Sequence, residues 1–383
     1  MDIKKTVTLS SVPIIFCSAL FVYCQGGWLT SDKAPASPLA PATCNKDRPA
    51  DPSLAYSKNP ILQKLAEYED VCHGAIVDEL MLFTAMPQTT AEATEFAEDT
   101  AASLQGFSAH HITPLVLFEP SLTAKLDLAS IHEGKYDSAL RLYFETLRML
   151  GVTDEAMGTW VLFPEANTPI WGTTDPGDFT KNVAKVGSMQ KSSFPNSRLS
   201  VLLNSRSYPS HDTNWSHGEL KSLKPYIAAL PPDLVDRFGY QGFPSMAEAN
   251  ASHQYRQLDA HDFLPDNLAR EAAELLHTNN IWINTGTFSR MYTDRSATEV
   301  KVESEERRNT LATTLEQAKS LQAQGFSISV NIFAEDKSLK GEHVDWSYWQ
   351  HGLPGQGSDA KVFTWFVSEL RKSDLGFSLY DHM

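Results

Sequence analysis

The sequence predicts a (β/α)8 barrel, and three observations lead to this fold class. Strand-like and helix-like segments alternate along most of the 383 residues, which predicts βαβ units and a parallel sheet. The strand-like segments are short, continuous apolar runs, which are typical of strands buried on both faces. The chain carries neither the Gly-rich fingerprint of a dinucleotide-binding fold nor a Walker P-loop. A closed barrel therefore fits better than a doubly wound sheet.

Seven strands are expected, and most end in polar or turn-forming residues. They span residues 80–84, 112–118, 160–163, 199–203, 234–240, 281–284 and 326–333. A barrel of this class needs an eighth strand. No further run is evident, and we place the missing strand near Ala75.

The helices are expected between these strands. They span residues 90–104, 136–150, 179–189, 268–276, 305–324 and 363–371. The clearest is the second, because five large apolar residues lie on one of its faces: Leu140, Tyr143, Phe144, Leu147 and Leu150. The last helix is expected to close the chain.

Residues 1–25 are interpreted as a signal sequence or membrane anchor. Lys4 and Lys5 precede an uncharged run at 7–24 that is about as long as a membrane span or a long signal sequence. The positive flank places the N-terminus inside and the rest of the chain outside. Tyr23 is too large for a good lipidation motif before Cys24. An uncleaved anchor, or a signal sequence that matches the usual pattern poorly, is therefore favoured over a lipoprotein. An extracytoplasmic, membrane-anchored or secreted protein is expected.

Residues 26–55 are rich in Pro, Ala and Ser, which predicts a disordered linker. The barrel is expected to occupy residues 56–383. Cys44 and Cys72 lie in the exported part and could form one disulfide in an oxidising compartment. Two unpaired thiols fit the sequence equally well.

Composition narrows the choice of partner. The chain is 42% hydrophobic and 21% charged, as in globular proteins, and its formal net charge is −15. Such an acidic balance argues against nucleic acid, since phosphate binding needs a basic face. It leaves a neutral polysaccharide open. No cofactor is expected, and the loop with His211, Asp212 and His217 lacks the spacing typical of a metal site.

The stretch GTWVLFPEANTPIW (158–171) carries the main candidate for catalysis. Its apolar run ends just before Glu165, at the strand end where catalytic side chains of (β/α)8 barrels lie. The alternative is an ordinary capping carboxylate at a strand–helix junction. Other residues past strands or in aromatic loops suit a sugar, which has hydroxyls on its rim and flat C–H faces. The expected contacts are Asn167, Trp171, Asn204, Tyr208, Tyr240, Gln241, Thr285, Trp346 and Trp349. About half of the aromatic residues should be core, with Trp160 and Trp282 foremost.

Several motifs in this order resemble those of family-26 glycoside hydrolases, which are mostly β-mannanases. They are IHEGKYDSALRLYFETLRMLGV, WVLFPEANTPIWG, DPGDFTKNVAKV, RLSVLLNS, DRFGYQGFP and VDWSYW, within residues 131–349. The resemblance implies a (β/α)8 barrel, a retaining mechanism and Glu165 as the general acid/base. Pro164 stands where that family usually has His, which departs from its pattern.

The larger departure concerns the attacking carboxylate, which that family places at the end of the penultimate strand. We identify that strand as IWINTGTFS, where Thr285 (or Thr287, in a shifted register) takes the place of the glutamate. A threonine hydroxyl is a poor nucleophile without an activating base. A second carboxylate would then come from another strand end. Glu119 is the best candidate, because the sequence FEP around it, at the end of one strand, resembles the sequence FPE that ends in Glu165 after the next strand. A carboxylate that caps a loop also fits Glu119. The others are Glu335, Asp336 and Asp236.

Two functions follow from these residues. The first is a glycoside hydrolase acting on a β-linked polysaccharide, mannan-like or mixed-linkage glucan, with Glu165 protonating the leaving oxygen. The alternative is a catalytically inactive carbohydrate-binding barrel involved in cell-surface polysaccharide handling, which the missing glutamate favours. A structural surface protein without a ligand is a weaker third reading.

Overall fold

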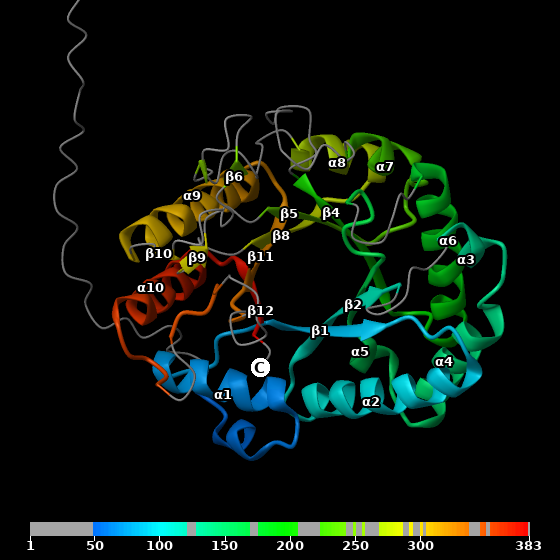
Figure 1. Ribbon diagram of the computed structural model, residues 1–383, viewed down its shortest axis with the longest axis horizontal. Helices are drawn as coiled ribbons and strands as arrows, with labels where there is room; N and C mark the ends of the chain where they lie inside the picture. Colours follow the sequence, from blue (N-terminus) through cyan, green and yellow to red (C-terminus); the bar gives the residue numbers. More distant parts are fainter. Residues whose placement is uncertain are drawn as a thin grey trace, which may run out of the picture. The chain divides into compact units, whose positions relative to one another are not determined.

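The computed structural model shows a closed barrel of eight parallel strands surrounded by helices (Figure 1). It describes residues 49–120, 128–168, 175–205, 223–242, 248–249, 255–256, 268–285, 291–293, 299–301, 304–336, 345–349 and 353–381. The strands are β1 (Glu79–Ala85), β2 (Thr113–Glu119), β3 (Thr159–Leu162), β4 (Arg198–Asn204), β5 (Arg237–Gly242), β8 (Asn280–Thr285), β11 (Ser327–Phe333) and β12 (Gly376–Tyr380). They follow one another around the barrel in chain order, and β12 pairs with β1 to close it.

The barrel confirms the predicted fold class and all seven predicted strands, but the position of the eighth was wrong. The missing strand is β12 at the end of the chain, whereas Ala75 lies between the first helix and β1. β12 is the five-residue segment GFSLY, too short and too mixed in polarity to stand out as an apolar run. This error changes the place of the later strands in the barrel order. The segment IWINT is the sixth strand of the barrel, and β11 is the penultimate one.

Helices cover the outside of the barrel between successive strands. They are α1 (Pro60–Cys72), α2 (Thr90–Ala109), α3 (Ala129–His132), α4 (Asp137–Met149), α5 (Asp154–Met157), α6 (Pro176–Ser193), α7 (Lys224–Ala229), α8 (Leu268–Leu276), α9 (Ser304–Ala323) and α10 (Ser358–Lys372). Local sequence fixes several starts. Thr89 and Glu92 form a capping box on α2, and Asn59 and Asp175 cap α1 and α6, each directly before a proline.

Two short antiparallel ribbons interrupt the connections that follow β5 and β8. The first pairs β6 (Glu248–Ala249) with β7 (Tyr255–Arg256), and the second pairs β9 (Met291–Thr293) with β10 (Glu299–Lys301). Both connections leave the carboxyl ends of barrel strands. The additions therefore belong to the side of the barrel on which catalytic residues of this fold lie.

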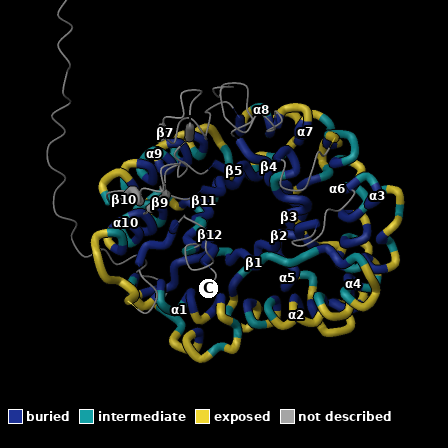
Figure 2. Tube along the Cα trace, viewed as in Figure 1, coloured by how far each residue is buried: buried dark blue, intermediate teal, exposed yellow. Residues whose placement is uncertain are grey.

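Most of the core lies between the strands and the helices, where both are dark blue in Figure 2. Trp160 of β3 is fully buried there and packs on Phe118 and Phe144, with ring centroids 5.4 Å and 5.7 Å apart. A smaller cluster fills the barrel interior and includes Leu202 and Trp282. Trp160 and Trp282 are both 0% exposed, so their expected place in the core is confirmed.

The amino end of the barrel interior is closed by an ion pair and an indole. Arg237 of β5 donates to the Glu79 carboxylate at 2.6 Å and also contacts the Ser329 hydroxyl. Trp282 of β8 lies beside this pair and donates from its indole nitrogen to Ser200 at 3.0 Å. Gly239 makes room for it, because a Cβ there would come within 2.2 Å of the indole. A packed floor of this kind leaves the opposite, carboxyl end for a site.

The barrel's contacts begin shortly before the predicted start at Tyr56. A 3-10 helix, η1 (Pro52–Tyr56), places Leu54 in the core at 1% exposure. The backbone of Asp51 donates to Glu69, and its carboxylate contacts His110 at 2.7 Å.

Residues 1–48, with the expected targeting segment and most of the linker, lie outside the described residues. Among those that are described, no helix is long and apolar enough to span a membrane. Cys72 is disulfide-bonded, and the chain's other cysteines lie outside the described residues.

Candidate site at the carboxyl end of the barrel

The turn after β3 holds Glu165 in an unusual backbone conformation. Phe163 and Glu165, on either side of Pro164, have φ angles of 52° and 57°, a left-handed region that residues with a side chain rarely adopt. Backbone hydrogen bonds hold this turn on both sides, from Phe163 to the Phe118 carbonyl at 3.1 Å and from Glu165 to the Leu202 carbonyl at 2.7 Å. Strain of this kind persists where the surroundings enforce it, and it concentrates at functional sites.

Asn167 braces this turn against the next strand. Its side-chain amide donates to the Asn204 carbonyl and accepts from the Asn204 backbone nitrogen, each at 2.9 Å. The side chain is 1% exposed. Its observed contacts therefore fix the position of Glu165 relative to β4, whereas the sequence suggested a direct contact with sugar.

A row of amide side chains lies at one level of the interior, on four consecutive strands. The strand pairing aligns Asn204 with Gln241, Gln241 with Asn284, and Asn284 with Asn331. Asn331 donates to the Oδ1 atom of Asn284 at 2.5 Å, and Asn284 donates to the Oε1 atom of Gln241 at 2.6 Å. All four residues are at least nine-tenths buried. This row gives the mouth of the barrel a polar floor.

Aromatic rings form a wall on the other side of the mouth. Tyr380 of β12 is stacked on Phe333 of β11 with centroids 4.8 Å apart, and it meets Phe83 of β1 edge-on at 4.7 Å. Trp346, from the segment after β11, packs edge-on against Phe333 at 5.6 Å. Flat apolar faces beside amide groups suit a ligand that is apolar on its faces and polar on its rim, as a sugar is.

Two buried carboxylates adjoin the aromatic wall. Glu119 closes β2 and Glu335 follows β11, and they are 7% and 3% exposed. Burial raises the pKa of Tyr380 well above its usual value, and the negative charges of Glu335, Asp381 and Glu119 raise it further. The Tyr380 hydroxyl therefore stays protonated at neutral pH and can donate a hydrogen bond.

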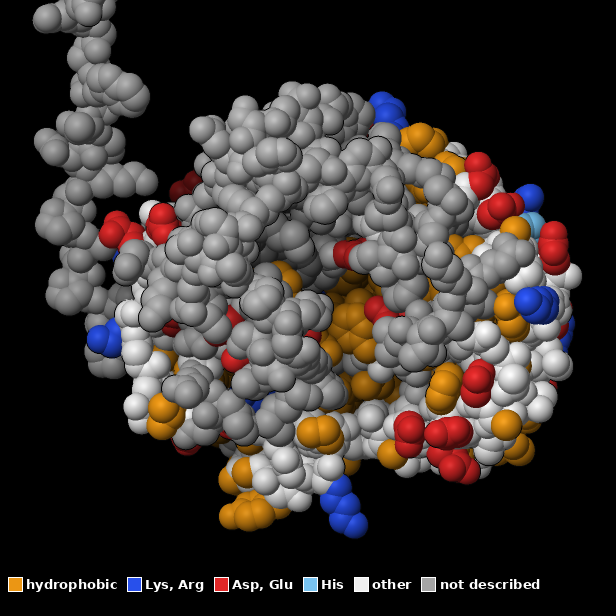
Figure 3. Space-filling view, viewed as in Figure 1, with side chains coloured by type: hydrophobic (Ala, Val, Ile, Leu, Met, Phe, Trp, Pro, Cys, Tyr) orange, Lys and Arg blue, Asp and Glu red, His pale blue; other side chains and the backbone are white. Residues whose placement is uncertain are grey.

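Glu335 and Glu165 follow strands that lie opposite each other. Between β3 and β11 the barrel order places β2, β1 and β12 on one side, and β4, β5 and β8 on the other. Glu119 follows β2, the direct neighbour of β3. Figure 3 shows apolar and acidic side chains together in the hollow at the centre of the face in view. Carboxylates on opposite sides of a barrel mouth can approach a bound molecule from both sides.

Glu335 overturns the conclusion that the penultimate strand carries no carboxylate. That conclusion assigned the penultimate place to IWINT, where Thr285 stood for the glutamate. The Thr285 hydroxyl donates to the Gly242 carbonyl at 2.9 Å, while Asn284 aligns with the interior amide row. The true penultimate strand, β11, is followed within two residues by Glu335.

The structure brings some predicted sugar contacts together and directs others away. Gln241, Asn204 and Trp346 lie around the mouth, as described above. Tyr240 and Trp349 belong to the core outside the barrel. Tyr240 is next to the inward-facing Gln241 on β5, so its side chain lies on the opposite face of the strand. Trp349 packs on Tyr68 of α1, with ring centroids 4.1 Å apart. Trp171 and Tyr208 lie outside the described residues. Tyr380, Phe83, Asn284 and Asn331 were not predicted. Tyr380 belongs to β12, which was not recognised as a strand, and the roles of the other three depend on the strand register.

The remaining carboxylates considered from the sequence lie elsewhere. Asp236 precedes β5, at the amino end of the barrel, where it accepts from the Leu199 backbone at 2.7 Å and lies 3.5 Å from the Lys191 ammonium. Asp336 forms a backbone bridge with Asp345. The described residues hold no group of three or more His, Cys, Asp or Glu side chains placed to bind a metal ion. His211, Asp212 and His217 are outside them.

Comparison with solved structures finds the same barrel among glycosidases. The chain is similar to the β-glycosidase BGL167, with a TM-score of 0.51, 12% identity, and 80% of this chain and 85% of that one covered. It is also similar to the family 1 β-glucosidase from Thermotoga maritima in complex with isofagomine lactam, with a TM-score of 0.51, 12% identity, and 82% and 86% covered. Neither a family model nor a curated protein matches the sequence. At this identity the likeness supports the barrel fold, and it does not single out family 26.

Proposed function

We propose that the protein is a glycoside hydrolase that cleaves a β-linked polysaccharide at the carboxyl end of the barrel. The observation that carries this proposal is the placement of Glu335 after β11, across the mouth from Glu165 after β3. A glycosidase needs two carboxyl groups that flank the scissile bond. The inactive carbohydrate-binding barrel was favoured by the missing carboxylate on the penultimate strand, and Glu335 removes that reason.

The exposure of the three carboxylates suggests their roles. Glu165 is partly exposed, whereas Glu119 and Glu335 are buried. The general acid must reach the leaving oxygen and later take a proton from water, which suits Glu165. Glu335, on the opposite side of the mouth, suits the attack on the anomeric carbon. Glu119 is a charge beside Tyr380, and Tyr380 can donate its hydrogen bond to Glu335 or to a sugar hydroxyl.

The reaction then proceeds by two displacements. The Glu335 carboxylate attacks the anomeric carbon while Glu165 gives its proton to the leaving oxygen, so the glycosidic bond breaks and a glycosyl ester forms. Glu165, now ionised, takes a proton from water, and the water oxygen displaces Glu335. The sugar is released with its original anomeric configuration, and both carboxyl groups return to their starting states.

The substrate and location are further parts of the proposal. A mannan-like or mixed-linkage β-glucan fits the resemblance to family-26 enzymes and a mouth lined by amides and aromatic rings. The apolar segment at 7–24 supports attachment to a membrane with the barrel outside the cytoplasm.

The test is hydrolysis of mannan and mixed-linkage glucan by wild type, Glu165→Gln, Glu335→Gln and Asp236→Asn. We expect Glu165→Gln to lower turnover by roughly 10²–10⁴-fold, the usual loss for a general acid. That loss should shrink on aryl glycosides with an activated leaving group, because these need no protonation. Glu335→Gln should lose activity on both substrate types, and Asp236→Asn, at the amino end of the barrel, is the matched control. Full activity of both glutamine variants on polysaccharide would refute the assignment.

A further inference from the structure

A cavity of about 1050 Å³ opens beside β1 and shares two residues with the candidate site. Phe83 and Tyr380 line it and also belong to the aromatic wall of the barrel mouth. The other walls come from the start of α1 and most of the length of α2. Typical small-molecule sites span roughly 300–1,000 Å³, so this cavity is slightly larger than most of them.

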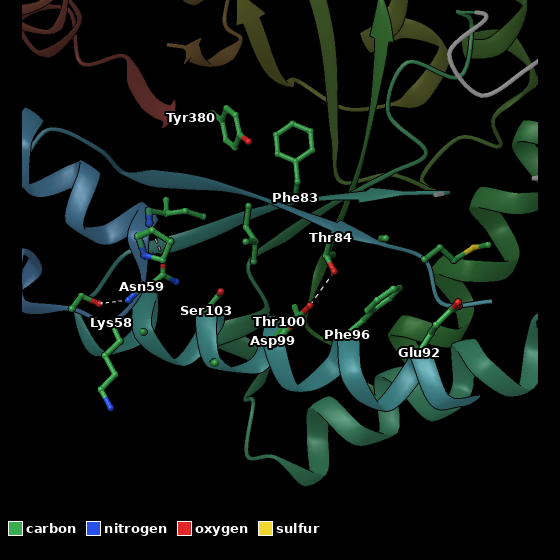
Figure 4. Close-up of a pocket in the computed structure, with 18 of the residues that line it drawn as sticks. Lys58, Asn59, Phe83, Thr84, Glu92, Phe96, Asp99, Thr100, Ser103 and Tyr380 are labelled. Atoms are coloured by element: carbon green, nitrogen blue, oxygen red, sulfur yellow. Dashed lines mark hydrogen bonds between the residues drawn. The ribbon is translucent and has the colours of Figure 1, made fainter. Parts of the chain in front are cut away.

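The pairing of β1 explains why the cavity reaches the mouth. β1 pairs with β2 from Glu79 to Ala85, but with β12 at Glu79 and Leu80 alone. The last three residues of β1, Phe83 to Ala85, are partly exposed although they belong to a barrel strand. Figure 4 shows Phe83 and Tyr380 on one side of this strand, and Thr84 pointing to α2 on the other. The cavity therefore runs from the mouth around the free edge of β1.

The lining has the mixed chemistry of a sugar site. Phe96 rises from α2, and hydroxyl groups of Thr84, Thr100 and Ser103 lie along the cavity. Thr84 and Thr100 are 3.0 Å apart and share their hydrogen bonding with the buried Tyr143, so their positions are fixed. Among the lining residues the charged groups are Lys58, Glu92 and Asp99. One ammonium against two carboxylates disfavours a strongly anionic ligand.

We propose that this cavity is a subsite for a neutral polysaccharide chain, holding sugar units that extend from the bond cleaved at the mouth. The inference rests on the proposed function, and it adds where the sugar units beyond the cleaved bond are bound. The aromatic wall guides the chain from the mouth over Phe83 and Tyr380 to Phe96. Ser103 is small and partly exposed, so the cavity keeps its depth at that point of α2.

The test measures binding, so that it does not depend on hydrolysis. Glu335→Gln protein is titrated with β-1,4-mannooligosaccharides and mixed-linkage β-glucan oligosaccharides, from single sugars to hexasaccharides. We expect affinity to rise with chain length. Ser103→Trp fills the cavity, and Phe96→Ala removes its aromatic face. Each should lower the ratio of hexasaccharide to monosaccharide affinity by about tenfold, or about 1.4 kcal/mol.

Thr94→Trp provides the matched control, because Thr94 is exposed on α2 and does not line the cavity. An affinity that does not depend on chain length, or an unchanged ratio in both cavity variants, would overturn the subsite. Binding that follows chain length without any hydrolysis by wild type would refute the proposed reaction and keep the subsite. If no oligosaccharide binds although wild type hydrolyses the polysaccharide, the subsite is refuted and the proposed reaction stands.

Discussion

At the scale of single residues, the site depends on positions that a sequence does not reveal. Glu165 was identifiable, because an apolar run ended just before it. Glu335 was also identifiable as a candidate for the second carboxylate, but Glu119 ranked ahead of it. Its importance depends on β11 being the penultimate strand, and that count depends on a strand that was not recognised. Tyr240 and Thr285 show the opposite problem. Each lies one residue from an inward-facing amide, and a shift of one residue reverses the face of a strand.

The carboxyl group of Asp381 gives a prediction about pH. Burial raises its pKa from 3.8 to about 7, while Lys64 and a hydrogen bond from Tyr68 at 2.6 Å lower it. The folded chain thus holds a proton that the unfolded chain releases near pH 4. Between about pH 4 and 7 the native state binds more protons, so this group makes stability fall as pH rises, by at most about 1.4 kcal/mol per pH unit.

Asp381→Asn keeps the shape of the side chain and removes its titration. We expect the variant and wild type to have similar free energies of unfolding near pH 4, and the variant to be more stable at pH 7 and above. Urea unfolding at several pH values measures the difference. Parallel stability profiles across this range would show that Asp381 does not titrate as its burial implies.

At the scale of elements, local signals predicted most of what the structure contains. The apolar runs and the amphipathic face of α4 all mark real strands and helices. The last strand and the start of the domain were not apparent, for one physical reason. Both β12 and η1 are five-residue segments, and they gain their stability from contacts with distant parts of the chain rather than from local pattern.

The start of the domain can be tested by truncation. A chain that begins at Pro49 keeps Leu54 in the core and the contacts of Asp51, whereas a chain that begins at Tyr56 loses both. Burying a leucine contributes roughly 1.5–3 kcal/mol. We expect both chains to fold and the shorter one to unfold at lower urea concentration, with Leu54→Ala in the longer chain accounting for most of the loss. Both lack residues 1–48, so Cys72 is in the same state in each. Equal midpoints would place the domain boundary at Tyr56.

At the scale of the whole molecule, closure of the barrel assembles the proposed active site. The carboxylates, the amide row and the aromatic wall come from strands far apart in the sequence, and the barrel order places Glu165 and Glu335 on opposite sides of one mouth. The fold class could be predicted because alternation is a repeated local signal. The pairing of distant carboxylates could not, because it follows from strand number and register, which only the closed barrel fixes.

Identifying the residue that attacks the sugar tests the proposed mechanism most sharply. An activated 2-deoxy-2-fluoro β-mannoside or β-glucoside slows release of the covalent intermediate, and mass spectrometry of proteolytic peptides then locates the attached sugar. We expect one labelled residue, Glu335, and no label in Glu335→Gln. A sugar attached to any other residue, or hydrolysis of the polysaccharide with inverted anomeric configuration, would contradict it.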